Sequence, residues 1–302
     1  MLKLDDLKKR MYYNEKYIVP KLKAVEQDKL AFDIANCSKT SCIATCSSCG
    51  TKYYAGSSHC KNRYCAICAK LRALAWLCKL VPLLQEYVKD GYKIFMLNLT
   101  IKDNANLDYI LNKLMKSWRI MTHDDKRCKK EFRSLNDGGI KAIEIKIGEN
   151  SGLWHPHIHS IVLLKTNKEV RQFNDYRKLW EYCTALACGT TNKVGSIDIR
   201  GLKGYDGDIV SAVVETFKYM TKLDWLNIPN EQLREMFKIT SNRRFISSWG
   251  VLYKINQQVE ALLNETSEEK LKEKACQVCG CTEFELENHL TKMLSADIFD
   301  LK

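Results

Sequence analysis

The chain lacks the apolar segments that would send it across a membrane or hold it there. Its first twenty residues, MLKLDDLKKRMYYNEKYIVP, contain no apolar core of the kind found in signal peptides. No run elsewhere approaches the roughly 18 consecutive apolar residues that a spanning helix requires. We therefore expect a cytoplasmic protein with no membrane partner.

Internal repeats and low-complexity tracts are also absent, and acidic residues are in the minority. The 302 residues are enough for two domains with a small appended module. Lys and Arg total 48 against 36 for Asp and Glu, a net charge of +12. This excess favours a polyanionic partner over a small neutral or cationic one.

The chain has 14 cysteines, which stay reduced in the cytoplasm, so close pairs indicate metal ligands rather than disulfides. Cys46 and Cys49 in CSSCG, with Cys65 and Cys68 in CAIC, form two C-x2-C pairs fifteen residues apart. This spacing is typical of a four-thiolate Zn²⁺ site. Four sulfur ligands leave no open coordination position, so we expect the zinc to be structural.

Further ligand candidates keep the zinc assignment open. Any of four neighbours can replace one of the named cysteines or serve a second ion: Cys37, Cys42, His59 and Cys60. Cys276 and Cys279 form a third C-x2-C pair, with Cys281 and His289 available to complete it. Whether this pair forms its own site or joins the first is open at this stage.

Between these cysteine pairs the chain alternates strand and helix patterns. The pattern predicts strands over 93–101, 140–148, 155–164 and 196–200, and helices over 69–90, 107–121, 172–187 and 208–223. Two strands in direct succession favour an antiparallel α+β sheet of the ferredoxin-like (RRM-like) kind over a parallel one. We expect three regions: 1–90 with the zinc module and a linking helix, 91–225 with the α+β core, and a helical 226–302.

Three of the six histidines lie within five positions, in GLWHPHIHSIVLL (152–164). Alternate side chains of a strand share a face, so His155, His157 and His159 should point the same way. An H-x-H pair on the polar face of a strand indicates metal ligation. The preceding strand would present Glu144 on its polar face, and the strand over 93–101 would present Asn98.

Two imidazoles and a carboxylate, with water or substrate oxygens completing the shell, suit Mn²⁺ or Mg²⁺ in a site that handles phosphate. We therefore expect His157 and His159 to bind this metal, with Glu144 as the third ligand.

The helix predicted in DIVSAVVETFKYMTKL (208–223) carries Tyr219 on its polar side, together with Glu215, Lys218 and Lys222. A phenol with a pKa of about 10 is a poor nucleophile, but nearby ammonium groups favour its phenolate or hold a phosphate. The alternative is a solvated face stabilised by pairs of side chains one turn apart.

These segments resemble, in order, the three motifs of the rolling-circle replication initiators of small plasmids and related phages, which belong to the HUH endonuclease superfamily. The three are FMLNLTIKD (95–103), HPHIHSIVLL (155–164) and VVETFKYMTK (213–222). SSHCKNRYCAIC (57–68) also resembles the Cys-rich segment of the plasmid initiators. The resemblance covers about 46–222.

The resemblance implies an HUH core in which His157 and His159 bind the divalent metal, with Glu144. Tyr219 would cut single-stranded origin DNA, leaving a 5′-phosphotyrosine and a 3′-hydroxyl primer. Glu215 would activate water at termination. Expected partners are single- and double-stranded origin DNA, a host helicase and a polymerase.

Other functions fit parts of the pattern. A relaxase or single-strand transposase of the same superfamily shares the chemistry. A zinc-containing nucleic-acid-binding regulator would use the H-x-H pair only structurally. A phosphoesterase for small molecules leaves the Cys module and the charge unexplained.

Overall fold

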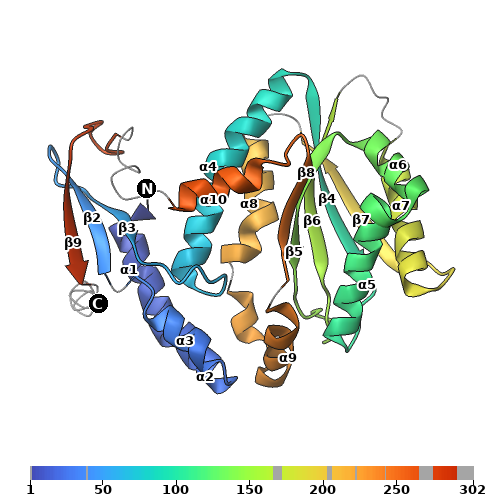
Figure 1. Ribbon diagram of the computed structural model, residues 1–302, viewed down its shortest axis with the longest axis horizontal. Helices are drawn as coiled ribbons and strands as arrows, with labels where there is room; N and C mark the ends of the chain where they lie inside the picture. Colours follow the sequence, from blue (N-terminus) through green and yellow to red (C-terminus); the bar gives the residue numbers. More distant parts are fainter. Residues whose placement is uncertain are drawn as a thin grey trace. The chain divides into compact units, whose positions relative to one another are not determined.

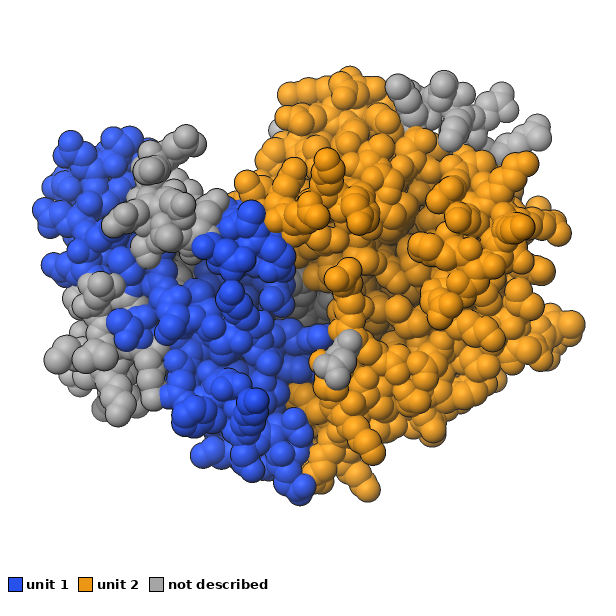
Figure 2. Space-filling model, viewed as in Figure 1, with its two compact units in different colours: residues 1–75, 220–226, 260–302 blue, residues 76–219, 227–259 orange. Residues whose placement is uncertain are grey.

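The computed structural model of the protein describes residues 2–38, 40–165, 172–202, 206–221, 223–241, 243–264 and 275–290 (Figure 1). The chain divides into two compact units, coloured separately in Figure 2. Unit 1 comprises 1–75, 220–226 and 260–302, and unit 2 comprises 76–219 and 227–259. Unit 2 is therefore inserted into the sequence of unit 1. Each unit has its own antiparallel sheet, so the protein is α+β.

Unit 1 consists mostly of N-terminal elements. They are β1 (Leu2–Lys3), α1 (Leu4–Tyr13), the π-helical turn η1 (Asn14–Ile18), α2 (Val19–Ala24), α3 (Asp28–Ala35), β2 (Thr40–Cys46), β3 (Lys52–Ser57) and the start of α4 (Ala66–Lys89). The C-terminal strand β9 (Phe284–Leu290) completes a sheet of order β1-β3-β2-β9. β9 pairs with the whole of β2, from Thr40 opposite Leu290 to Cys46 opposite Phe284. Strands from the first and the last described segments thus share one sheet.

Unit 2 is built on a five-stranded sheet of order β7-β4-β6-β5-β8, in which every neighbouring pair is antiparallel. Its strands are β4 (Tyr92–Ile101), β5 (Gly138–Glu144), β6 (His157–Lys165), β7 (Gly195–Gly201) and β8 (Ile246–Gly250). Its helices are the later part of α4, α5 (Leu107–Arg119) with the π turn η2 (Ile120–Asp124), α6 (Lys126–Leu135), α7 (Gln172–Cys188), most of α8 (Asp206–Thr221), α9 (Asn230–Thr240) and most of α10 (Ile255–Asn264). A 3-10 turn, η3 (Asp224–Asn227), precedes α9.

The two faces of the unit 2 sheet are covered by different helices. α5, α6 and α7 lie against one face, and α4 and α8 lie on the other side (Figure 1). Lys141 of β5 points to the first face, where its ammonium group lies 4.6 Å from the ring centre of Trp118 in α5. Glu144, three positions later, points to the opposite face. On that side Phe217 of α8 stacks on Trp76 of α4, with ring centres 4.9 Å apart.

The structure confirms an α+β protein with an antiparallel sheet at its centre and strands and helices close to the expected ranges. It differs after 226, where the expected helical region also contains β8 and β9. β8 carries little of the alternation that marks a strand. β9 alternates apolar residues with glutamates, but it is short and mostly polar. The expected region boundaries at 90 and 225 stay predictions.

Candidate metal sites

The face of the unit 2 sheet opposite α5 gathers the polar side chains expected from the sequence. His157 pairs with Glu144 on one side and with Thr100 on the other, and His159 pairs with Asn98. Directly paired residues of antiparallel strands point to the same face. Three strands therefore contribute to one polar surface, as the alternation predicts.

Glu144 and His159 point at each other within this surface. Nε2 of His159 donates a hydrogen bond to Oε2 of Glu144 at 2.9 Å. Two ligands at adjacent corners of an octahedron with bonds of about 2.1 Å would lie about 3.0 Å apart. The rings of His157 and His159 are tilted, with centres 5.8 Å apart. The spacing of Glu144 and His159 therefore matches a pair of metal ligands, and His157 stands beside them.

His157 has surroundings that would suit a metal ligand. The residue is 5% exposed, and neither ring nitrogen has a hydrogen-bond partner among the residues that the structure describes. Burial, and then the nearby His155 and Lys146, lower the pKa of His157 to about 3. The imidazole is therefore neutral at neutral pH and keeps a lone pair. Oδ1 of Asn98 is likewise buried without a partner in the described part of the chain. Such groups are rare in folded proteins, and a bound cation would satisfy them.

Asp103, just after β4, is a contributor that the sequence argument did not assign. Its carboxylate accepts hydrogen bonds from Nδ1 of His155 and, at 2.5 Å, from Oγ of Ser151. Burial acts to raise the pKa of Asp103, but these two hydrogen bonds outweigh it and lower the pKa. The His155 ring lies perpendicular to that of His157, with centres 4.3 Å apart. Asp103 thus holds His155 in place beside the candidate ligand His157.

Helix α8 lies on the side of the sheet that carries the histidines (Figure 1). Glu215 is half-buried in this helix. The backbones of Lys218 and Tyr219 belong to α8, but their side chains, and all of Lys222, lie outside the described residues. The expected roles of these four residues stay predictions.

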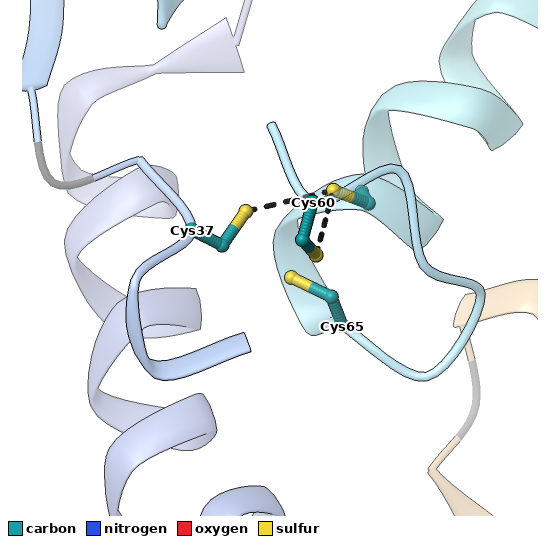
Figure 3. A group of neighbouring side chains, drawn as sticks. Cys37, Cys60 and Cys65 are labelled. Carbon is teal, nitrogen blue, oxygen red and sulfur yellow. Dashed lines mark hydrogen bonds between the residues drawn. The ribbon is translucent and has the colours of Figure 1, made fainter. Parts of the chain in front are cut away.

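Unit 1 contains two groups of four cysteines, each with its sulfur atoms within 4.8 Å of one another. We call the first, Cys37, Cys60, Cys65 and Cys68, the α4 quartet. It joins the end of α3 to the start of α4, and Figure 3 shows the sulfurs of Cys37, Cys60 and Cys65 turned toward a common centre. Sγ of Cys68 lies 3.6 Å from those of Cys37 and Cys60. Asn14 donates from Nδ2 to Sγ of Cys65 at 3.3 Å.

The second group, Cys46, Cys49, Cys276 and Cys279, we call the β9 quartet. Sγ of Cys46 lies 3.5 Å from that of Cys279, and Sγ of Cys49 lies 3.5 Å from that of Cys276. The sulfurs of a tetrahedral zinc site with bonds of about 2.3 Å are about 3.8 Å apart, whereas a disulfide bond is about 2.05 Å long. Both quartets can therefore hold a metal ion such as zinc.

The structure does not bring the four cysteines of the expected zinc site together. Cys46 and Cys49 belong to the β9 quartet, whereas Cys65 and Cys68 belong to the α4 quartet. Each C-x2-C pair is completed by residues that the sequence had left open.

The chain matches the model of the replication protein family over residues 51–290, more than half of its length. It therefore belongs to the replication protein family. A curated protein named Protein rep, from Streptococcus pneumoniae serotype 2 (strain D39 / NCTC 7466), is 22% identical over 213 residues, covering 67% of this chain and 63% of that protein. Protein rep of Lactiplantibacillus plantarum is 24% identical over 216 residues, covering 67% and 66%.

The chain thus spans less than two thirds of the length of either relative. No solved structure matches it. Among the described residues, no helix is both long and apolar enough to cross a bilayer.

Proposed function

We propose that this protein initiates rolling-circle replication by nicking single-stranded origin DNA in the cytoplasm. One observation carries the proposal: in a member of the replication protein family, two buried imidazoles and a carboxylate lie on one face of a sheet, and one imidazole contacts the carboxylate. The net charge of +12 suits DNA as the partner. The 3′-hydroxyl left by the nick would be the primer for a polymerase, and a host helicase would open the duplex ahead of it.

The fold of unit 2 supports an HUH core of the ferredoxin-like kind. In chain order its first four strands are β4, β5, β6 and β7, and they lie side by side as β7-β4-β6-β5. This is the arrangement expected when two strand-helix-strand halves interleave in an antiparallel sheet. α5 to α7 cover one face and leave the other for the metal ligands and α8 (Figure 1).

In the proposed site His157, His159 and Glu144 hold a Mn²⁺ or Mg²⁺ ion. When bound, the ion polarises the scissile phosphate and stabilises the charge that develops on the leaving oxygen. Asp103 keeps His155 beside His157, so that the ligand stays oriented. Burial of both ligand imidazoles keeps water from replacing them.

Tyr219 is the proposed nucleophile. The phenol loses its proton to solvent, and the resulting phenolate oxygen forms a bond to phosphorus as the bond to the 3′ oxygen breaks. The leaving oxygen takes a proton and becomes the 3′-hydroxyl, and the 5′-phosphate stays on Tyr219 as an ester. Lys218 and Lys222 favour the phenolate or hold the phosphate. Because the phosphoester is preserved, the strand can be rejoined.

Glu215 stands one helical turn before Tyr219 on α8. We assign it the general base for termination, where it takes a proton from a water molecule that attacks the phosphotyrosine. Attack releases Tyr219 and a free 5′-phosphate, so that the protein leaves the DNA after one round.

The test uses a labelled single-stranded origin oligonucleotide with Mn²⁺, followed by denaturing electrophoresis. The unmodified protein should give a denaturation-resistant protein–DNA band, and Tyr219→Phe should give none while still binding DNA. Tyr182→Phe is the matched control, because Tyr182 is an exposed tyrosine on α7. A band that persists in Tyr219→Phe would exclude Tyr219 as the nucleophile. No band from the unmodified protein would favour a non-catalytic DNA-binding regulator.

A further inference from the structure

We propose that the β9 quartet binds a second structural zinc ion, which fastens the C-terminal strand to the N-terminal sheet. This ion is separate from the one that the α4 quartet would hold. The proposal concerns unit 1 alone and does not depend on the nicking reaction.

The two halves of the β9 quartet are two copies of one backbone turn, CSSCGT (46–51) and CQVCGC (276–281). In each, the glycine N–H donates to the carbonyl of the first cysteine: Gly50 to Cys46 and Gly280 to Cys276, both at 2.9 Å. Each first cysteine also donates its own N–H to the carbonyl five residues on, at 2.9 Å and 2.7 Å. Both turns therefore present two sulfurs in the same way.

Glycine is required in both turns by backbone conformation rather than by space. Gly50 has φ +69° and Gly280 has φ +75°, and a Cβ at either position would meet nothing within 4 Å. A positive φ is the conformation that glycine adopts at little cost. The two C-x2-C-G turns are far apart in the sequence but alike in geometry. This similarity points to one shared requirement: each turn supplies two thiolate ligands to the same ion.

The sulfurs alternate between the two turns. Cys46 faces Cys279 and Cys49 faces Cys276, both at 3.5 Å, so each of these close contacts joins one turn to the other. Four thiolates at such distances would repel one another, and a divalent cation at their centre would remove this repulsion. Two thiolates from each side complete a tetrahedral shell with no position left for a substrate.

The surroundings of the β9 quartet orient its sulfurs. The hydroxyl of Tyr53, a fully buried residue, accepts the N–H of Gln277 at 3.1 Å. Its own proton is therefore available to Sγ of Cys276, 3.2 Å away. Oγ1 of Thr51 lies 3.0 Å from Sγ of Cys49. Donors of this kind support the negative charge of ligand sulfurs in metal sites.

Apolar burial alone holds the C-terminal segment weakly. Among the side chains described between 275 and 287, Cys276 is fully buried, Cys281 and Phe284 are half-buried and the rest are exposed. β9 also lies at the edge of its sheet, with β2 as its neighbour. Small units with little apolar core commonly depend on metal ions or disulfides. A zinc ion would add a cross-link between this segment and the rest of the sheet.

Cys281 offers a matched control within the same segment. It lies two positions after Cys279, but it belongs to neither quartet. Its sulfur accepts the N–H of Glu283 at 3.4 Å. Cys281→Ser should therefore keep the zinc content and the fold.

The experiment measures zinc per chain by mass spectrometry of metals on the full-length protein, purified under reducing conditions. The unmodified protein and Cys281→Ser should each contain two zinc ions, and the Cys276→Ser, Cys279→Ser double variant should contain one. Hydrogen exchange should accelerate in 40–46 and 284–290 of the double variant, while 138–144 and 157–165 in unit 2 keep their protection. Retained protection in unit 2 shows that the double variant is folded.

Three outcomes would overturn the proposal. They are a single zinc ion in the unmodified protein, two ions retained by the double variant, and a disulfide between the two turns found by mass spectrometry in the reduced preparation. Loss of DNA nicking in the Tyr219 test would leave this result untouched, because the zinc count does not use DNA.

Discussion

Replacing Tyr53 by Phe removes one oxygen atom from the β9 quartet and leaves its packing in place. The Tyr53 ring meets Phe284 edge-on, with ring centres 5.9 Å apart, and Phe can keep this contact. What is lost is the hydroxyl that accepts from Gln277 and lies 3.2 Å from Sγ of Cys276. The hydrogen bond from Tyr53 is the main cause that lowers the pKa of Cys276 to about 6.

A hydrogen bond to a charged group is stronger than one between neutral groups, and its loss typically corresponds to about ten- to hundredfold in affinity. We therefore expect Tyr53→Phe to weaken zinc binding at the β9 quartet by about ten- to hundredfold. Because the pKa of Cys276 then rises, protons compete better for its sulfur, and zinc should leave at a higher pH than in the unmodified protein.

Titration with a competing zinc chelator measures both effects. The α4 quartet does not contain Tyr53 and serves as the internal reference, so one release step should move and the other should stay. Tyr253→Phe, in an exposed tyrosine of unit 2, is the external control. If both zinc ions leave at the same chelator concentration in Tyr53→Phe and in the unmodified protein, the hydroxyl does not support the site.

Two further predictions concern unit 2. Glu215→Ala should nick origin DNA but fail to terminate, because the water then lacks its base; normal release of product circles would count against this role. The buried His157 should make the metal-free protein acid-sensitive. The unfolded state binds a proton below about pH 6.5, whereas the folded state does so near pH 3. The free energy of unfolding should therefore fall by about 1.4 kcal/mol per pH unit between these values. Urea titrations at several pH values should show a weaker dependence in His157→Gln, and identical slopes would refute the argument.

The polar surface of the unit 2 sheet could be predicted from the sequence because it depends on the order of residues within each strand. Alternation along each strand decides which side chains share a face, and this places His157, His159 and Glu144 together once the strands pair in register. Asp103 escaped assignment because it lies beyond the end of its strand. Its place beside His155 depends on the turn that carries Ser151.

The cysteine quartets could not be predicted, because spacing shows which cysteines form a pair but not which pairs share an ion. Cys49 and Cys276 are 227 positions apart, and no local pattern joins them. The strand β9 was missed for a related reason: its glutamates and asparagine give it a polar composition, and its position comes from pairing with β2.

Helix α6 was not predicted either, although the sequence contains the apolar spacing of a helix there. Cys128, Phe132 and Leu135 recur at helical spacing and are all buried. Most of the other residues of α6 are charged, so these three buried positions do not stand out as an apolar face in the segment KRCKKEFRSL.

Because unit 2 is inserted in the sequence between the two halves of the β9 quartet, the parts of the molecule are synthesised and can fold in a fixed order. Cys46 and Cys49 leave the ribosome 227 or more positions ahead of their partners. At about 5–20 residues per second, the first turn waits some 10 to 45 seconds for the second. During that time the edge of β2 that β9 will cover is open, and unit 2 can fold completely. The N-terminal sheet is thus among the first parts of the chain to be made and among the last to be finished.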